Sequence, residues 1–430
     1  MQIDLQGKTI LLGITGSIAA YKACEVARLF VKAGADVHVV MSNSAQRFVS
    51  ALTFEALTHN PVLHEESESW SSDLNHIDIG KKVDIFLIAP ATANTINKLS
   101  KGIADTLLLQ TALAYSGTLL IAPAANTQMI ANHYTEGSLK MLAVNDVLII
   151  SPQEKLLACG DEGNGALSDP QEIFYQGCKA LLEEDFWQYR KVVVTGGGTR
   201  EKIDEVRYLS NYSSGKMAKS LATALYLRGA DVCYISTMPH DDLPEEIYTI
   251  DVEDAAEMLE YTTDAVRVAK KGTMSKASLN NPEAIGMIQK VPYLFMAAAV
   301  ADFTPTHPQS GKLKKSQLGE QWDIHLKQTE DILKSVNKEG IITVGFKAEM
   351  DSEKGLQHAK NLITHKAVTA VCYNLLKDSQ SFGSTENEIT FITEAEAFAL
   401  GKMDKLPLSF KILEQSMLLE SRLLEKGTHE

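Results

Sequence analysis

Three side chains in the first half of the chain are of types that move protons or hold carboxyl groups. His76 lies among polar neighbours just before the apolar run Ile85–Ala91, where a histidine can act as an acid, a base or an anion contact. Asn126 follows the apolar run Thr118–Pro123, and its amide can hold a carboxylate or a carbonyl. Cys159 lies in a segment rich in Gly and Asp, where a thiol is more exposed than most lone cysteines. A capping histidine, a turn asparagine and an inert thiol are the plain structural alternatives.

Glycine and small residues gather where strands should end. The segment Gly13–Lys22 places a glycine turn before a helix, which exposes N–H groups suited to a phosphate, although it is neither GxGxxG nor a P-loop. The small residues of Ala89–Leu108 would let a planar ligand approach the backbone at the end of a strand. Val194–Ala218 is dense in Gly, Ser, Asn, Arg and Lys, and this composition before a helix indicates a nucleotide-phosphate loop. A tight turn or a bland loop fits the first two segments equally well.

The second half adds charged candidates. Ala297–Phe303 is expected to be a buried strand that ends in an acid, Asp302, and Val344–Glu349 and Ser381–Asn387 are expected to be further strand-end loops. The lysine-rich run Lys312–Lys315 follows the acid on an expected loop, and a solvated charge run is the usual interpretation of such a sequence. Its place near a Gly/Ser-rich loop and a strand-end acid favours anion binding instead.

The elements that would position these residues alternate between strand and helix. Strands are expected at Lys8–Gly16, Asp36–Ser42, Asp84–Pro90, Thr118–Pro123, Val147–Ser151 and Lys191–Gly198, with amphipathic helices between them. Pro152–Pro170 is predicted to be a loop with no element of its own, and Glu183–Lys191 a linker. Because KAGADVHVV in the first half is echoed by LRGADVCYI in the second, we expect two α/β domains, each with a doubly wound parallel sheet.

Composition argues against several classes of protein, including nucleic-acid-binding and membrane-spanning proteins. The chain has 430 residues with 41 Lys+Arg and 55 Asp+Glu, a net charge of −14, which disfavours binding to nucleic acid or anionic lipid. No apolar run is long enough to span a membrane, and the start of the chain shows no signal peptide. The five cysteines are scattered without metal-binding spacing, which fits a reducing cytoplasm.

Taken together and in order, the motifs resemble those of the bacterial bifunctional coenzyme A biosynthesis enzymes. In this family, phosphopantothenoylcysteine decarboxylase is fused to phosphopantothenate–cysteine ligase. The resemblance rests on SIAAYK, HIDIG, APATAN, ACGD, TREKIDEVRYLSNYSSGKM, AAVADF, KLKK, VGFKAE and FGSTEN, of which the run Thr199–Met217 is the most specific. It implies a flavodoxin-like decarboxylase domain over residues 1–187 and a Rossmann-like ligase domain over residues 190–430.

For the first domain the resemblance implies a flavin-containing cysteine decarboxylase that uses FMN to make 4′-phosphopantetheine and CO₂ from 4′-phospho-N-pantothenoylcysteine. His76 would handle the substrate carboxylate or a proton, Asn126 would bind substrate, and Cys159 would protonate the reduced intermediate. The residues that match the family's FMN contacts are Gly16, Ser17, Ile18, Ser42, Thr92, Ala93, Asn94 and Ala124. Family members build this site between the subunits of a trimer.

For the second domain the resemblance implies a CTP-dependent ligase with Mg²⁺. It would join 4′-phosphopantothenate and cysteine through an acyl-cytidylate, with Asn211 holding that intermediate and Lys312 on a flap. The residues that match nucleotide contacts are Asp302, Lys312, Glu330, Asp331, Ile332, Leu333, Phe346 and Lys366. Metal ligands are not implied. Ligase dimers would join decarboxylase trimers into a dodecamer.

Several positions depart from the family pattern. Ala125 replaces a common Met, Ala166 a common Arg, Leu362 a second nucleotide-binding lysine and Glu330 a common Pro, and the region Asp264–Lys290 holds an extra segment. Because the five candidate catalytic residues are retained, both activities are expected. The alternatives are an enzyme with only the ligase half active, and a flavin-binding regulatory protein without turnover.

Overall fold

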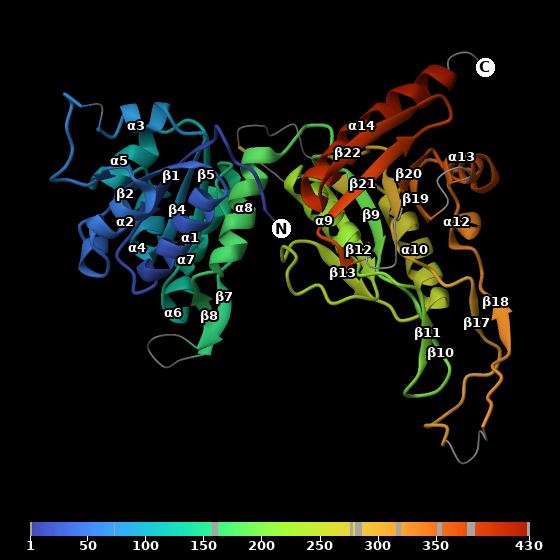
Figure 1. Ribbon diagram of the computed structural model, residues 1–430. Coiled ribbons are helices and arrows are strands. Elements are labelled where there is room, and N and C mark those ends of the chain that lie inside the picture. Colours follow the sequence, from blue (N-terminus) through green and yellow to red (C-terminus); the bar gives the residue numbers. More distant parts are fainter. Residues whose placement is uncertain are drawn as a thin grey trace. The chain divides into compact units, whose positions relative to one another are not determined.

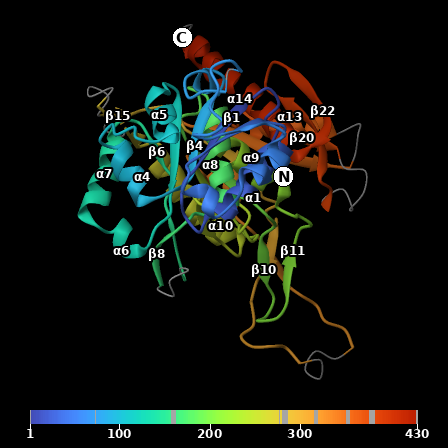
Figure 2. The same ribbon diagram turned by 90° about the vertical axis from the view of Figure 1, so that its left-hand side faces the viewer.

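The computed structural model divides the chain into two compact units, which are described separately (Figures 1 and 2). It describes residues 2–72, 74–156, 162–275, 278–279, 286–314, 320–350, 355–375 and 383–427. The N-terminal unit comprises Gln2–Glu183 together with Ser275–Gly286. The C-terminal unit comprises Glu184–Met274 and Met287–Glu430. Among the described helices, none is long and apolar enough to cross a bilayer.

The N-terminal unit is built on one parallel sheet in the order β3-β2-β1-β4-β5-β6. Its strands are β1 (Thr9–Ile14), β2 (Asp36–Met41), β3 (Val62–Leu63), β4 (Ile85–Ala91), β5 (Thr118–Pro123) and β6 (Leu148–Ile149). Without the two-residue edge strand β3, the other five run in the flavodoxin order, with the topological switch between β1 and β4. The prediction of a doubly wound α/β fold is confirmed.

Helices cover both faces of this sheet. They are α1 (Ala20–Lys32), α2 (Ala51–Thr58), α3 (Asp78–Lys81), α4 (Ala93–Leu99), α5 (Leu107–Ala114), α6 (Thr127–Ile130), α7 (His133–Val144) and α8 (Pro170–Leu182), with a 3₁₀ turn at Ala45–Arg47. On one face α1 and α8 meet, with the rings of Phe30 and Phe174 5.0 Å apart edge to face. On the other face Leu11 and Phe86 belong to a buried cluster with side chains of α4 and α5. Strands covered on both faces must be apolar throughout, which is why β4 is buried at every position.

The prediction that Pro152–Pro170 lacks an element of its own is wrong. Two strands, β7 (Gln153–Leu156) and β8 (Glu162–Ala166), pair antiparallel within it. Their sequences are polar or glycine-rich, so they lack the apolar alternation that signals a strand. Residues 157–161, and with them Cys159, lie outside the described residues.

The C-terminal unit has an eight-stranded sheet in the order β13-β12-β9-β16-β19-β20-β21-β22. The strands are β9 (Lys191–Gly196), β12 (Asp231–Ser236), β13 (Tyr248–Asp251), β16 (Tyr293–Met296), β19 (Ile342–Glu349), β20 (Ala370–Leu375), β21 (Glu386–Ile392) and β22 (Ala397–Asp404). All neighbours pair in parallel except β20–β21 and β21–β22, which are antiparallel. The second predicted parallel sheet is therefore present, extended by an antiparallel edge.

Helices and three small pairs of strands complete this unit. The helices are α9 (Lys216–Leu227), α10 (Ala255–Ala269), α12 (Ile332–Ser335), α13 (Gly355–Lys366) and α14 (Lys405–Gly427). The pairs are β10 (Arg200–Lys202) with β11 (Tyr208–Ser210), β14 (Thr273–Met274) with β15 (Met287–Ile288), and β17 (Phe303–Pro305) with β18 (Leu326–Gln328). Figure 1 shows β10–β11 and β17–β18 next to each other, projecting from this unit.

Buried Arg190 holds α14 at the start of this unit. Its guanidinium pairs with Glu420 of α14 at 2.8 Å and donates to the carbonyls of Val291 and Phe186. The guanidinium also lies over the Phe186 ring, 4.0 Å from its centroid. A buried cation needs this many partners to offset its lost hydration. Arg190 therefore joins the chain entering the unit to the last helix.

The predicted strand Ala297–Phe303 is also wrong in its bounds, because β16 ends at Met296 and Ala297–Asp302 is a loop. The amide of Ala299 donates to the Gly197 carbonyl at 2.7 Å, and that of Ala301 donates to the Thr199 hydroxyl at 2.9 Å. These bonds turn the chain away from the ladder and fix it as a loop beside the end of β9. Conversely, the predicted strand-end loop Val344–Glu349 belongs to β19.

Candidate functional sites

The N-terminal unit has a cavity of about 780 Å³ at the carboxyl ends of β1, β2, β4 and β5. Parallel sheets bind ligands at this edge, beside the topological switch. All eight residues predicted to contact FMN line it, together with Asn126. Ala125 and Ala166, two departures from the family pattern, also line it. The remaining lining residues are Thr15, Ala19, Tyr21, Lys22, Ser44, Thr95, Thr106, Leu108, Leu109, Met129, Gly165 and Leu167.

Close approach between two loops explains the glycine at position 16. A Cβ on Gly16 would lie 2.5 Å from the Cβ of Ser44, so only glycine fits. The buried Thr15 hydroxyl donates to the Pro90 carbonyl at 2.7 Å and accepts from the Thr92 amide at 3.0 Å. These bonds fix the loop after β1 against the loop after β4. Because α1 has no acidic residue in its first turn, nothing there opposes a phosphate.

The opposite wall is held by helix caps. The Thr92 hydroxyl accepts from the Thr95 amide and caps α4, and the Asn126 side-chain oxygen accepts from the Gln128 amide and caps α6. The Ala125 amide donates to the Gly165 carbonyl at 3.1 Å, which brings β8 against the same wall. Side chains on this wall are small, so a planar ring can lie close to the backbone. The cavity therefore fits a phosphorylated, planar cofactor such as a flavin.

His76 is not among the described residues that line this cavity. Its Nδ1 lies 2.7 Å from a carboxylate oxygen of Glu68, and its ring meets the edge of Trp70 at 5.5 Å. The side chain keeps 21% of its surface exposed. Sequence reasoning missed Glu68 and Trp70, and their eight- and six-residue separations from His76 carry no periodic signal. Glu68 can fix the orientation of the imidazole through this contact.

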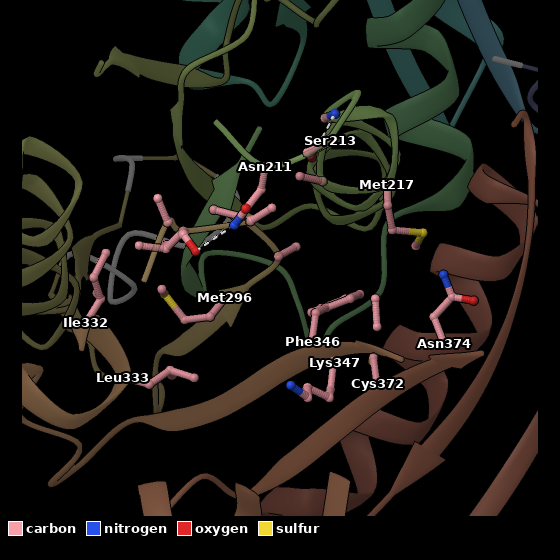
Figure 3. A pocket seen from close by; sticks show the side chains of 18 of the residues that line it. Asn211, Ser213, Met217, Met296, Ile332, Leu333, Phe346, Lys347, Cys372 and Asn374 are labelled. Carbon is pink, nitrogen blue, oxygen red and sulfur yellow. Dashed lines mark hydrogen bonds between the residues drawn. The ribbon is translucent and has the colours of Figure 1, made fainter. Parts of the chain in front are cut away.

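The C-terminal unit has a cavity of about 570 Å³ at the carboxyl ends of β16, β19 and β20 (Figure 3). It brings together residues predicted from widely separated motifs: Asn211, Asp302, Glu330, Asp331, Ile332, Leu333, Phe346 and Lys366. Leu362, a departure from the family pattern, also lines it. Lys312 is not among the lining residues that the structure describes.

Asn211 enters the cavity from the segment that follows β11. Its side-chain amide donates to the Val300 carbonyl at 3.0 Å, the bond drawn dashed in Figure 3. A Cβ on Gly198 would lie 2.8 Å from the Asn211 carbonyl, so a glycine is needed for this approach. The amide is thereby positioned over the Ala297–Asp302 loop.

The predicted nucleotide residues form one end of the cavity. Asp331 caps α12 by accepting from the Lys334 amide, and its carboxylate pairs with Lys366 of α13 at 3.0 Å. Glu330 accepts a hydrogen bond from the Ser335 hydroxyl at 2.7 Å. The other end holds residues that were not predicted individually: Lys216, Met217, Asn374, Asn387 and Lys405. Lys216 and Met217 lie in the segment Val194–Ala218, which the sequence indicates as a nucleotide-phosphate loop. Asn387 belongs to the FGSTEN motif, but nothing in the sequence marks Lys405.

The loop that carries Lys312 is anchored to the β10–β11 turn through its neighbour Leu313. The Leu313 amide donates to the Asp204 carboxylate at 3.2 Å, and the Leu313 carbonyl accepts from the Arg207 guanidinium at 2.6 Å. Asp204 also pairs with Arg207 at 2.8 Å, and its side chain is fully buried. Burial opposes ionisation of Asp204, but the amides of Val206, Arg207 and Leu313 outweigh it and lower its pKa.

Neither cavity has a pre-formed metal centre among the residues that the structure describes. Within the described part of the chain, no group of three or more His, Cys, Asp or Glu side chains could hold a metal ion. In the C-terminal cavity Asp331 is committed to Lys366 and Glu330 to Ser335.

Two family models together match most of the chain. The model described as "Flavoprotein" matches residues 2–181, and that of the "DNA/pantothenate metabolism flavoprotein C-terminal domain" matches residues 187–418. The second model covers more than half of the chain. Fold, cavities and models thus define a flavoprotein domain followed by a pantothenate-metabolism domain.

Comparison with curated relatives identifies the family within this class of protein. The chain is 36% identical over 431 residues to the coenzyme A biosynthesis bifunctional protein CoaBC of Bacillus subtilis (strain 168), covering 98% of this chain and 100% of the relative. It is 34% identical over 398 residues to the protein of the same name from Mycolicibacterium smegmatis, covering 89% and 90%. The chain therefore belongs to the family of CoaBC bifunctional proteins of coenzyme A biosynthesis.

Solved structures match single parts of the chain. A mutant PPC decarboxylase complexed with pantothenoylaminoethenethiol is 32% identical and covers 40% of this chain and 96% of its own, with a TM-score of 0.37. The C-terminal domain of a CoaBC protein is 24% identical and covers 56% and 100%, with a TM-score of 0.41.

Family membership confirms the activity expected from the resemblance. The chain is a bifunctional enzyme of coenzyme A biosynthesis with decarboxylase and ligase activities, and it acts on small molecules. The non-catalytic alternative is not favoured. The flavoprotein match also supports the predicted FMN.

Proposed function

We propose that the N-terminal unit converts 4′-phospho-N-pantothenoylcysteine to 4′-phosphopantetheine and CO₂ with FMN. The C-terminal unit would make that substrate from 4′-phosphopantothenate and cysteine at the expense of CTP, by way of an acyl-cytidylate. The observation that carries the proposal is what each cavity gathers from separate loops. One has the eight predicted FMN contacts with Asn126, and the other has Asn211 with the predicted nucleotide contacts other than Lys312. The domain limits 1–187 and 190–430 belong to this proposal.

In the decarboxylase, the protein would bind and orient while the flavin supplies redox chemistry. The chemistry that bound FMN would supply is redox: uptake of a hydride from the thiol-bearing carbon as the thiol loses its proton, and return of that hydride after CO₂ has left. With that carbon as a thioaldehyde, the carboxylate lies β to C=S, so the electrons left by CO₂ are spread onto sulfur. The Gly16–Ile18 turn and Ser42 would hold the flavin phosphate, and Thr92, Ala93, Asn94 and Ala124 its ring and ribityl edge. Asn126 would hold the substrate, and Cys159 would donate the final proton.

His76 needs a second copy of the chain in this scheme, because the described lining of its own cavity does not include it. We therefore include in the proposal a trimer of decarboxylase units, with His76 of one copy serving the cavity of another. Ligase dimers would link the trimers into a dodecamer, in the cytoplasm. Native mass spectrometry gives the subunit number, and a monomer that decarboxylates would contradict this part of the proposal.

In the ligase, positioning and charge neutralisation would do most of the work. A carboxylate oxygen of 4′-phosphopantothenate attacks the α-phosphorus of CTP and pyrophosphate leaves. The amine of cysteine then attacks the acyl carbon, loses a proton and displaces CMP. Asn211 would hold the acyl-cytidylate and Lys312 would neutralise phosphate charge. Asp302, Glu330–Leu333, Phe346 and Lys366 would bind the nucleotide, with Mg²⁺ on its phosphates.

One experiment tests both halves. Purified protein is incubated with 4′-phosphopantothenate, cysteine, CTP and Mg²⁺, and products are followed by mass spectrometry. We expect 4′-phosphopantetheine, CO₂, CMP and pyrophosphate. Accumulation of phosphopantothenoylcysteine would leave only the ligase half active and point to Ala125 or Ala166. The absence of any cytidylate would overturn the ligase mechanism.

A further inference from the structure

Two lysines line the end of the C-terminal cavity away from Glu330–Leu333. Lys216 lies within the run Thr199–Met217, whereas Lys405 lies in none of the motifs. Lys216 is the first residue of α9 and Lys405 the first residue of α14, and these two helices pack against each other. Both lysines line the cavity. Lys216 is exposed, whereas Lys405 has only 7% of its surface exposed.

Neither ammonium group meets a carboxylate among the described residues. Lys216 donates to the Gly383 carbonyl at 2.8 Å, and Lys405 donates to the Ser384 carbonyl. An ammonium group has three N–H donors, so each lysine retains capacity beyond this bond. Among the described residues, therefore, no carboxylate balances the charge of buried Lys405.

Other lysines nearby are paired. Lys366 and Lys347, which line the same cavity, lie 3.0 Å from Asp331 and 3.2 Å from Glu349. Outside the cavity, Lys402 pairs with Glu386 at 2.7 Å. Lys334, at the other end of the cavity, also lacks a carboxylate partner among the described residues. The Lys216–Lys405 end differs in that two such lysines are close enough for the charge of one to act on the other.

Electrostatics at this end favour the arrival of an anion. Burial lowers the pKa of Lys405, and the neighbouring charge of Lys216 lowers it further. Both lysines also stand in the first turn of a helix, where the macrodipole is positive and a cation is unfavourable. A bound anion would offset three unfavourable terms: the desolvation of Lys405, the repulsion between the two lysines and their interaction with the positive ends of the helix dipoles.

Two amides complete this end. Asn374 on β20 has no hydrogen-bond partner for its side chain within the described ranges, and Figure 3 shows it beside Met217 and away from Ile332 and Leu333. Asn387 on β21 directs its amide toward the Met217 sulfur at 3.9 Å. Side-chain N–H groups of this kind can donate to phosphate oxygens.

We propose that Lys216 and Lys405, with Asn374 beside them, form a phosphate-binding subsite of the ligase cavity. The inference rests on the proposed ligase function, in which two substrates carry phosphate: CTP with its polyphosphate, and 4′-phosphopantothenate with its monoester. The chemistry of recognition is the same for both, so the experiment must separate them.

The test uses the full-length enzyme with Lys405→Met, Lys216→Met and the control Lys402→Met. Dissociation constants are measured for CTP, cytidine, 4′-phosphopantothenate and pantothenate. Loss of one charge-assisted contact should weaken one phosphorylated ligand by about 10- to 100-fold. Cytidine and pantothenate should bind as before, and the control should match wild type. A loss confined to CTP places the polyphosphate here, and one confined to 4′-phosphopantothenate places the monoester here.

Equal affinities in all variants would overturn the subsite. So would equal weakening of phosphorylated and unphosphorylated ligands, because that marks a structural role. Substitution of buried Lys405 can disturb folding, whereas Lys216 is exposed. Lys216→Met therefore tests the subsite without that effect, and Lys405→Arg should retain phosphate binding. If the wild type binds neither CTP nor 4′-phosphopantothenate, the ligase assignment itself fails and the subsite falls with it.

Discussion

The two cavities lie at the same edge of similar sheets, yet their linings are opposite in character. Among its described lining residues, the N-terminal cavity has Lys22 as its one charged side chain. The C-terminal cavity holds both signs: Lys216, Asp302, Glu330, Asp331, Lys334, Lys347, Lys366 and Lys405. A flavin brings its own reactive ring, so its site needs shape and small residues. Joining an acid to an amine through a nucleotide needs charge neutralisation, so that site needs ions.

The largest expected effect tests whether the two cavities work independently. Asn211→Ala removes the amide that would hold the acyl-cytidylate. Loss of one such donor costs roughly 10²- to 10³-fold in turnover. Ligation should fall by that factor, measured as CMP release. Decarboxylation of supplied phosphopantothenoylcysteine should be unchanged, and a parallel fall in CO₂ release would contradict the separation.

A substitution in the first cavity gives the reciprocal test. In Gly16→Ala the new Cβ would overlap Ser44, which lies 2.5 Å from its position. Overpacking of about 1–3 kcal/mol, if it falls on the FMN-bound form, corresponds to roughly 5- to 150-fold weaker FMN binding. Flavin absorbance of the purified protein and a dissociation constant measure this loss. The control Gly137→Ala meets nothing within 4 Å and should keep the flavin. Full flavin retention by Gly16→Ala would show that this turn does not contact the cofactor.

The third test concerns Glu68 and His76, which do not belong to the described lining of the N-terminal cavity. Glu68→Gln removes the charge that lies 2.7 Å from the imidazole nitrogen. If Glu68 orients His76, decarboxylation should slow by roughly tenfold, with little change in substrate KM and none in ligation. Glu66→Gln, two residues away along the chain and exposed, is the control. An unchanged pH–rate profile and rate would rule out the positioning role.

The smallest expected effect concerns the anchor of the Lys312 loop. The folded-state pKa of Asp204 is lowered from 3.8. Its stabilising contribution is therefore complete above the unfolded value and is lost as the pH falls through the folded value. Asp204→Asn should lower the urea midpoint at pH 7, and the deficit should shrink below about pH 4. Trp322, whose ring lies 4.9 Å from the Arg207 guanidinium, provides the fluorescence signal. A deficit independent of pH would mean that the charge of Asp204 contributes nothing.

Much of the architecture follows from sequence, because buried parallel strands such as Ile85–Ala91 must be apolar at every position. Strand-end motifs also predict a shared site, since the ends of parallel strands meet at one edge of a sheet. The β7–β8 pair was not predicted, because its glycine and polar residues show no apolar alternation. Asp204 and Leu313 are 109 residues apart, and Lys216 and Gly383 are 167 apart. Contacts of that range depend on tertiary packing, which local patterns do not encode.

The last helix, α14, connects the C-terminal cavity to the Arg190 anchor. α14 carries Lys405 at its first turn and Glu420, the partner of Arg190, fifteen residues later. At 1.5 Å per residue, the backbone positions of these two residues are about 22 Å apart along the axis of one helix. A shift of α14 along its axis would move Lys405 and Glu420 together. The position of one therefore cannot change without the position of the other. The geometry of the cavity is thereby tied to the segment through which the chain enters the unit.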